Sequence, residues 1–261
     1  MVAQTASGYA LNAMAAADML ASWILSTARA RRIKRAKITL IVIKGDFMRL
    51  FEKYRPTTWP EVVGQDKAIK TIERFRDGAG LAGRAFWISG KSGQGKTTIG
   101  KLICAEVADP FYTDELDAGE LTCSRLSEIE RVMHLYGAGS KTGRAWIFNE
   151  AHGLRKAVIR QFLVLLEHLP RHIVVVFTTT VDGMELFEEG IDAGPLLSRC
   201  ECISLSQRDV AQAFAKRAQE IAKAENLDGQ PIAAYLRLVN DCGGNFRAVL
   251  QKIESGKMLK A

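Results

Sequence analysis

The stretch AFWISGKSGQGKT, residues 85–97, decides how this chain folds. A short apolar run leads into the pattern Gly-x-x-x-x-Gly-Lys-Thr, and the apolar-periodic segment TTIGKLICAEVA, residues 97–108, follows it. A strand before this pattern and a helix after it are the context that marks a phosphate-binding loop. The sequence therefore predicts a strand, a loop that binds a nucleotide through its phosphates, and a helix, in that order.

Each residue type in the loop has a physical task. Glycines let the backbone turn tightly and aim its N–H groups at phosphate oxygens, and the start of the following helix adds a partial positive charge. Lys96 is expected to reach the β- and γ-phosphates, and the Thr97 hydroxyl is expected to bind Mg²⁺. The predicted nucleotide contacts in the loop are Gly90, Gly93, Gln94, Gly95, Lys96, Thr97 and Thr98. An ordinary glycine-rich turn would leave the Lys-Thr pair at this spacing unexplained.

Charge is spread unevenly along the chain. The net charge is +7 over 261 residues; residues 1–47 hold seven basic and two acidic side chains, hence +5, and the other 214 residues hold +2. The basic leader therefore says little about nucleic-acid binding by the main body. Its basic cluster follows its apolar segment, the reverse of a secretory signal, and its alanines, serines and Asp18 argue against a membrane span. We expect the leader to be poorly ordered or not native, with a globular domain from Met48; an amphipathic surface helix and a transit peptide are the alternatives.

The five cysteines are scattered and form no Cys-x-x-Cys pair, which is typical of reduced thiols in a cytoplasmic protein. Cys200 and Cys202 would share one face of a strand, but no second pair and no nearby histidine completes a four-ligand zinc site.

The segment EKYRPTTWPEVVGQD, residues 52–66, followed by the phosphate-binding loop, resembles the start of the clamp-loader branch of the AAA+ ATPases. That branch includes replication factor C small subunits and bacterial clamp-loader subunits, which open a ring-shaped sliding clamp and place it on primed DNA. The resemblance implies ATP as the nucleotide, with Tyr54, Arg55, Pro56 and Val63 around the adenine and ribose. An N-terminal arm that packs on the core is the alternative reading of this segment.

The segment RAWIFNEAH, residues 144–152, resembles the Walker B strand of the same family. The family has Asp-Glu-x-His where this chain has Asn149-Glu150-Ala151-His152. The resemblance implies that Glu150 activates the attacking water. Asn149 can accept a hydrogen bond from a Mg²⁺-bound water but supplies no negative charge, so weaker Mg²⁺ binding and slower turnover are expected.

Three further motifs follow in the order that the family has them. RHIVVVFTTT, residues 171–180, reads as a buried strand, and the resemblance makes Thr180, or Thr179, the sensor of the γ-phosphate. Ser198-Arg199-Cys200 implies that Arg199 reaches the ATP of a neighbouring subunit, and Gly244-Asn245-Phe246-Arg247 implies that Arg247 contacts the γ-phosphate from a lid. A threonine-rich strand end and ordinary exposed arginines are the alternatives.

Periodicity predicts several helices. SRLSEIERVMHLYG, residues 124–137, reads as a helix capped by Ser124 or Ser127 whose apolar face extends to Tyr136. GLRKAVIRQFLVLLEHLP, residues 153–170, starts with Arg155, Lys156 and Arg160, which could contact DNA phosphates or form a solvated basic face. Residues 207–258 read as three helices.

These features together predict an α/β fold: a P-loop AAA+ domain with a central parallel sheet flanked by helices, then a small all-helical lid. The expected boundaries are 1–47 for the leader, 48–206 for the ATPase domain and 207–261 for the lid, with no collar domain. The expected function is that of an ATP-binding, ATP-hydrolysing clamp-loader-like subunit with Mg²⁺ as cofactor. Its expected partners are other AAA+ subunits, a sliding clamp and primer-template DNA, with no membrane contact by the core. A weakly hydrolysing scaffold subunit and a AAA+ remodeller or helicase of another branch are the alternatives.

Overall fold

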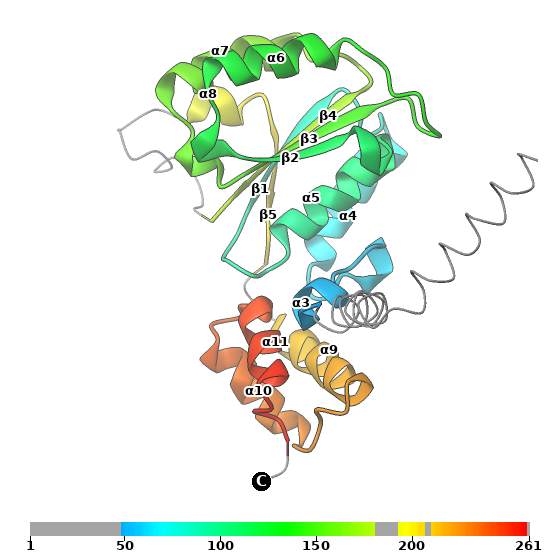
Figure 1. Cartoon of the computed structure of the whole chain (residues 1–261), viewed down its shortest axis with the longest axis vertical. Helices are drawn as coiled ribbons and strands as arrows, with labels where there is room; N and C mark the ends of the chain where they lie inside the picture. The colour runs from blue at the N-terminus through cyan, green and yellow to red at the C-terminus, as the bar shows by residue number, and fades with distance from the viewer. Residues whose placement is uncertain (1–47, 181–192, 207–209, 260–261) are drawn as a thin grey trace, which may run out of the picture. The chain divides into compact units, whose positions relative to one another are not determined.

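A computed structural model describes residues 48–180, 193–206 and 210–259, and the predicted leader, residues 1–47, lies outside this range. The described residues from Leu50 onward belong to one compact unit. Figure 1 shows their helices and strands in chain order.

A five-stranded parallel sheet is the centre of the fold. Its strands lie in the order β2-β3-β4-β1-β5, and every neighbouring pair is parallel. Their bounds are Arg84–Ser89 (β1), Thr113–Asp117 (β2), Arg144–Asn149 (β3), Ile173–Thr179 (β4) and Glu201–Ser204 (β5). All seven residues of β4 are buried, because helices cover both faces of the sheet at this strand. The predicted parallel α/β sheet is confirmed.

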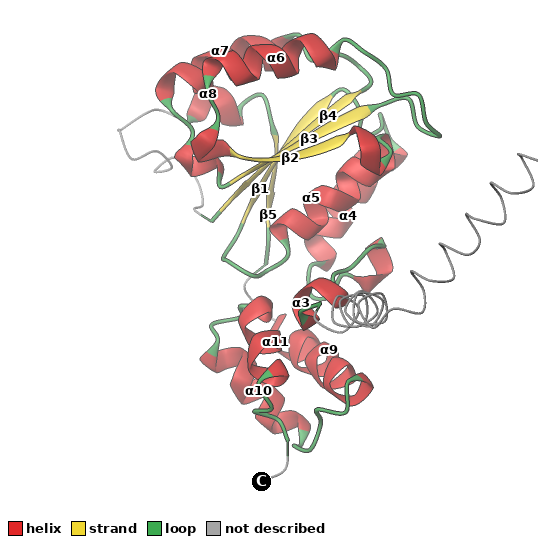
Figure 2. Cartoon of the chain, in the orientation of Figure 1, coloured by secondary structure: helices red, strands yellow, loops and turns green. Residues whose placement is uncertain are grey.

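Helices form a layer on each face of the sheet (Figure 2). Asp66–Asp77 (α4) and Lys96–Val107 (α5) pack on one face, and Cys123–Met133 (α6), Lys156–Glu167 (α7) and Gly194–Leu197 (α8) pack on the other. Successive strand residues alternate between the two cores: Phe86 and Ile88 face α4 and α5, whereas Ala85 and Trp87 face the opposite layer. Short 3-10 turns connect these elements at Trp59–Glu61, Pro110–Tyr112, Ala118–Glu120 and Ala151–Gly153.

Aromatic rings fill the layer between the sheet and α7. The ring centroids of Phe148, Phe162 and Phe177 are 5.1–5.5 Å apart, and Trp87 lies 5.6 Å from Phe177. Offset and edge-to-face contacts at these distances add to the free energy gained by burying the rings.

Three helices follow the sheet, as the sequence predicts. They are Val210–Ala224 (α9), Ile232–Asp241 (α10) and Phe246–Glu254 (α11), and they share a separate apolar core. The first helix of the described chain, Leu50–Lys53 (α3), buries Leu50 in that core. The hydroxyl of Tyr54 donates a hydrogen bond to Glu225, and Lys53 Nζ lies 2.7 Å from the same carboxylate. The predicted domain boundaries stay predictions.

The structure corrects two details of the helix at 124–137. Thr122, not Ser124 or Ser127, caps α6, because its hydroxyl accepts a hydrogen bond from the Arg125 N–H at 3.2 Å. The helix ends at Met133, so Tyr136 lies beyond it and is 66% exposed instead of buried.

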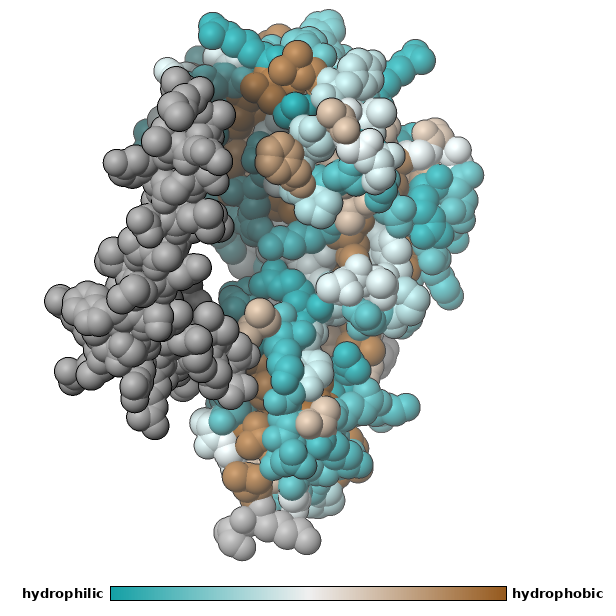
Figure 3. All heavy atoms as spheres, turned by 45° about the vertical axis from the view of Figure 1, so that its right-hand side comes forward, coloured by the Kyte–Doolittle hydropathy of each residue, from teal (hydrophilic) through white to brown (hydrophobic). Residues whose placement is uncertain are grey.

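Figure 3 shows hydrophilic and apolar side chains interspersed on the face that it draws. Within the described ranges, every helix is too short or too polar to cross a membrane.

The aromatic cluster gives a stability prediction. Phe177 is fully buried between Trp87, Phe148 and Phe162, so Phe177→Ala should lower the free energy of unfolding by about 3–5 kcal/mol. Urea denaturation followed by circular dichroism measures this. Val164→Ala on α7 is the matched control: its side chain is 57% exposed, and a change within about 0.5 kcal/mol is expected. Equal losses in the two variants would refute this account of the core.

Candidate nucleotide-binding site

The phosphate-binding loop connects β1 to α5. Gly95 caps the start of α5 with a φ of 99°, a left-handed conformation that favours glycine. The helix has twelve residues, so its free N–H groups and its dipole create a region attractive to anions at the loop.

Two buried side chains form hydrogen bonds with the backbone of the loop. Lys96 is only 7% exposed, and its Nζ donates to the carbonyl oxygens of Gly90 at 2.8 Å and Lys91 at 3.1 Å. The Gln94 side chain is also buried, and its Oε1 accepts from the Lys91 N–H at 2.9 Å. A bound phosphate would replace these carbonyls as partners of Lys96, and such an exchange between polar partners has a small net cost.

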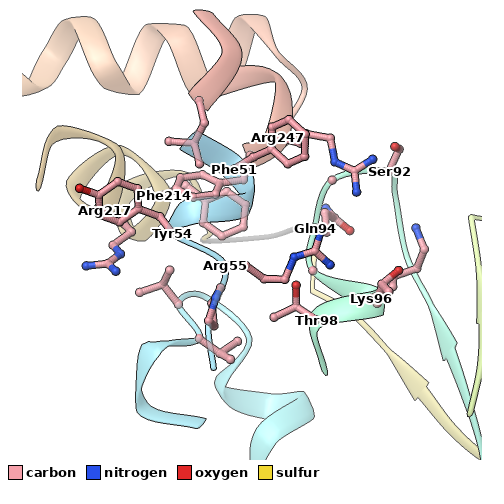
Figure 4. A pocket seen from close by; sticks show the side chains of 18 of the residues that line it. Phe51, Tyr54, Arg55, Ser92, Gln94, Lys96, Thr98, Phe214, Arg217 and Arg247 are labelled. Atoms are coloured by element: carbon pink, nitrogen blue, oxygen red, sulfur yellow. The ribbon is translucent and has the colours of Figure 1, made fainter. Parts of the chain in front are cut away.

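The loop borders a pocket with a volume of about 990 Å³, open solvent included. Figure 4 shows Arg55 and Arg247 directed toward the loop that carries Ser92, Gln94 and Lys96. The basic side chains in the lining outnumber the acidic ones; they are Arg55, Lys96, Arg217 and Arg247 against Glu61 and Glu150. This excess of positive charge suits a polyphosphate.

Most of the predicted nucleotide contacts meet in this pocket. The predicted residues that line it are Arg55, Pro56, Val63, Gly93, Gln94, Gly95, Lys96, Thr97, Thr98, Glu150 and Arg247, together with Tyr54. Gly90 is not in the lining and contributes instead the carbonyl that holds Lys96. Their roles toward a nucleotide stay predictions.

The pocket also has apolar lining residues that the sequence did not reveal. Phe51, Phe214 and Phe246 come from α3, α9 and α11, and Arg247 lies 5.4 Å from the Phe51 ring centroid. Periodicity marks these phenylalanines only as core residues, because it does not show which helices meet at the loop.

The C-terminal helices contact the loop directly. The Phe246 N–H donates to the Gly93 carbonyl at 3.2 Å. Asn245 caps α11 through its Oδ1, which accepts from the Ala248 N–H at 3.0 Å. A Cβ built on Gly93 would lie 1.8 Å from the same Oδ1, so the start of α11 can approach only because residue 93 is glycine.

Asn149 at the end of β3 joins the loop to the neighbouring strands. Its Oδ1 accepts from the Thr97 hydroxyl at 3.1 Å and from the Thr178 hydroxyl at 2.9 Å. Its Nδ2 donates to Glu115 Oε1 at 2.7 Å, and Glu115 Oε2 pairs with Lys101 Nζ at 2.7 Å. Sequence reasoning missed Thr178 and Glu115, because only the sheet order shows that β4 and β2 flank β3.

Glu150 follows Asn149 in a left-handed conformation, with φ 52° and ψ 50°. A non-glycine residue in this region carries backbone strain of about 1–3 kcal/mol, and such strain is concentrated at functional sites. Glu150 Oε2 lies 3.5 Å from His152 Nδ1, and the Thr179 hydroxyl lies 3.4 Å from the same nitrogen. Thr180 follows β4, is partly exposed and is not in the pocket lining.

Arg199 is not in the lining of its own chain's pocket. Its guanidinium forms an ion pair with Glu167 and donates to the Pro195 carbonyl at 2.7 Å. The hydrogen bond from Arg199 lowers the pKa of the Glu167 carboxyl, and the positive charge lowers it further.

The described residues contain no group of three or more His, Cys, Asp or Glu side chains arranged to hold a metal ion. Oxygen donors still fit Mg²⁺ beside a nucleotide, since the Thr97 hydroxyl and the Asn149 carbonyl lie 3.1 Å apart. Burial raises the pKa of the Cys200 thiol, which disfavours the thiolate that zinc binding requires.

Comparison with known proteins gives several related replication subunits. The DNA polymerase III subunit gamma/tau of Mycobacterium tuberculosis is 28% identical over 157 residues, which cover 51% of this chain and 27% of that protein. The Bacillus subtilis subunit tau is 22% identical over 82% of this chain and 41% of its own length. Replication factor C subunit 3 of Saccharomyces cerevisiae is 26% identical over 79% of this chain and 59% of its own length. The chain thus spans less than two thirds of each of these relatives.

Among solved structures, the Thermotoga maritima RuvB Holliday junction branch migration motor superposes with a TM-score of 0.60 at 18% identity, over 77% of this chain and 64% of that one. No family profile matches the sequence. The sheet order, the loop and the C-terminal helices give this chain the AAA+ fold of that structure. By sequence the chain is a distant homologue of clamp-loader subunits, which confirms the resemblance seen in its motifs.

The contact at Gly93 gives a prediction about nucleotide binding. Gly93→Ala would force Asn245 away and place alanine at a φ of +74°, so the affinity for a fluorescent ATP analogue should fall at least about tenfold. Gly80→Ala is the matched control: Gly80 has a φ of +84°, but its added Cβ would meet nothing within 4 Å. Gly80→Ala should therefore lower the unfolding temperature through backbone strain and leave the affinity for the ATP analogue unchanged. Equal affinities in the two variants would contradict the close approach of α11.

Proposed function

We propose that this protein is an ATP-binding and ATP-hydrolysing clamp-loader-like subunit that acts in DNA replication or repair. The observation that carries the proposal is the pocket, where the loop residues Lys96 and Thr97 meet Glu150, which directly follows β3, and Arg247 from α11. Distant homology to the clamp-loader subunits supports it.

The lining residues divide by chemistry. Apolar side chains such as Phe51, Val63 and Phe214 suit a base, whereas Lys96 and Arg247 suit phosphates. Mg²⁺, when bound, would neutralise charge on the phosphates, and Thr97 and Asn149 would hold it, the latter through a water. Glu150 would orient and deprotonate the attacking water, with His152 beside it.

Arg199 is proposed to act on the pocket of a neighbouring subunit. It lies outside its own pocket and is held by Glu167 at the end of α7, so it is available to exchange this partner for a phosphate. An arginine supplied in this way stabilises the charge of the transferred phosphoryl group. The proposal therefore includes an oligomer of identical or related AAA+ subunits.

Two described surfaces fit the other proposed partners. Phe111, Leu135 and Tyr136 are exposed apolar side chains; Phe111 lies just before β2, and Tyr136 stacks on His172 just before β4. Such residues are candidates for contact with a protein such as a sliding clamp. Arg155, Lys156 and Arg160 are exposed at the start of α7 and could contact the phosphates of primer-template DNA. We propose a cytoplasmic location on the same basis of homology.

A subunit that binds ATP but hydrolyses little is the second candidate. Asn149 favours it, because the amide cannot supply the negative charge that an aspartate would place beside Mg²⁺. A hydrogen bond to a charged group contributes about 1.5–3 kcal/mol, so we expect the free energy of Mg²⁺ binding to be weaker by an amount of this order.

Steady-state ATP hydrolysis separates these candidates. The full chain should hydrolyse ATP, faster with primed DNA and a sliding clamp, and Lys96→Ala should abolish turnover because Lys96 is the buried cation of the loop. Lys67→Ala, an exposed lysine on α4, is the control and should keep full activity. If Asn149→Asp hydrolysed ATP while the natural chain bound ATP without hydrolysing it, the second candidate function would replace the first.

Mixing variants tests whether Arg199 acts in trans. Arg199→Ala should lower turnover by about 10³-fold or more, as expected for removal of an arginine finger. Adding Lys96→Ala subunits, which keep Arg199 but lack a working loop, should restore part of the rate. Arg131→Ala, an exposed arginine on α6, should change nothing. A failure of the mixture to regain activity would argue against action on a neighbour.

A further inference from the structure

The Asn149 amide is held on both sides. Its oxygen faces Thr97 and Thr178, and its nitrogen faces Glu115 on β2, the strand next to β3. An amide group has nearly the same shape when its oxygen and nitrogen are exchanged, so its orientation depends on its hydrogen-bond partners.

Only one of these partners selects the orientation. The Thr97 and Thr178 hydroxyls can donate or accept, so they would tolerate either end of the amide. An ionised carboxylate can only accept, so Glu115 requires the Nδ2 end. The oxygen of Asn149 is then left facing Thr97, where the Mg²⁺ site is proposed.

Glu115 is itself fixed in place. Lys101 on α5 binds Oε2 at 2.7 Å, and Asn149 binds Oε1 at 2.7 Å, so each oxygen has a partner. Because Lys101 forms an ion pair with it, Glu115 is present as a carboxylate, and both of its oxygens are acceptors only.

We propose that Glu115 is a positioning residue of the Mg²⁺ site, which holds the Asn149 amide with its oxygen toward Thr97. This inference rests on the proposed ATP and Mg²⁺ binding at the same loop. It explains how an amide can serve at this position: without Glu115, the amide could turn its N–H group toward the water that a Mg²⁺ ion carries, and that group cannot accept a hydrogen bond.

The test compares the affinity for a fluorescent ATP analogue in Mg²⁺ and in EDTA, using the full chain. Glu115→Ala should reduce the factor by which Mg²⁺ tightens binding by about threefold to tenfold, the scale of one ordinary protein hydrogen bond. The affinity in EDTA should stay within about twofold, because the loop and the base-binding residues are unchanged. Glu115→Gln should also lose part of the Mg²⁺ effect, because its single side-chain carbonyl can accept from Lys101 or from Nδ2 but not from both.

Asp114→Ala is the matched control, since Asp114 is the preceding acidic residue of the same strand and is exposed. It should leave both affinities unchanged. Parallel losses in Mg²⁺ and EDTA, with a lower unfolding temperature, would overturn the proposal in favour of a purely structural role.

A second readout needs no nucleotide and separates this inference from the proposed function. In nuclear magnetic resonance spectra of the ¹⁵N-labelled chain, the Asn149 side-chain NH₂ signals, assigned by their loss in Asn149→Leu, should exchange slowly with water. They should exchange quickly in Glu115→Ala. Slow exchange in Glu115→Ala would overturn the positioning role of Glu115. If the natural chain bound no ATP but its Asn149 NH₂ signals exchanged slowly, and those of Glu115→Ala quickly, only the proposed function would be refuted.

Discussion

The parallel direction of all five strands is the constraint on which the site depends. Parallel strands end at the same edge of a sheet, so Ser89, Asn149 and Thr179 finish β1, β3 and β4 side by side. The phosphate-binding loop leaves the sheet at this edge, and the helix that follows it packs back on the β3 and β4 side chains. Reversing any of these strands would move its last residue to the opposite edge. The order and direction of the strands therefore bring the residues of the candidate site to one edge of the sheet, whatever contacts their side chains then make.

The pocket beside this edge needs both ends of the described sequence. Residues 51–63 reach it before the first strand, and residues 214–250 reach it after the last one. The Gly93 carbonyl connects the loop to the second of these segments, because it accepts a hydrogen bond from the Phe246 N–H at the start of α11. A change in the loop conformation would alter that bond, so the helical part has a direct physical means of responding to what the loop binds.

Local patterns in the sequence predicted the local structure well. The loop spacing and the unbroken β-branched run of β4 each identify an element without reference to the rest of the chain. The Thr122 cap was missed because three nearby polar residues could cap α6 and only the backbone geometry chooses among them. The bond between Glu115 and Asn149 joins residues 34 positions apart, and it depends on a strand order that the sequence alone does not state.

The composition of β2 affects how this protein behaves in a crowded solution. β2 is an edge strand with the sequence TDELD, so it carries three carboxylates within five residues. An edge strand offers unpaired backbone groups to any other strand, and dense negative charge opposes such pairing between identical chains. The three carboxylates of β2 thus oppose aggregation of the sheet through this edge.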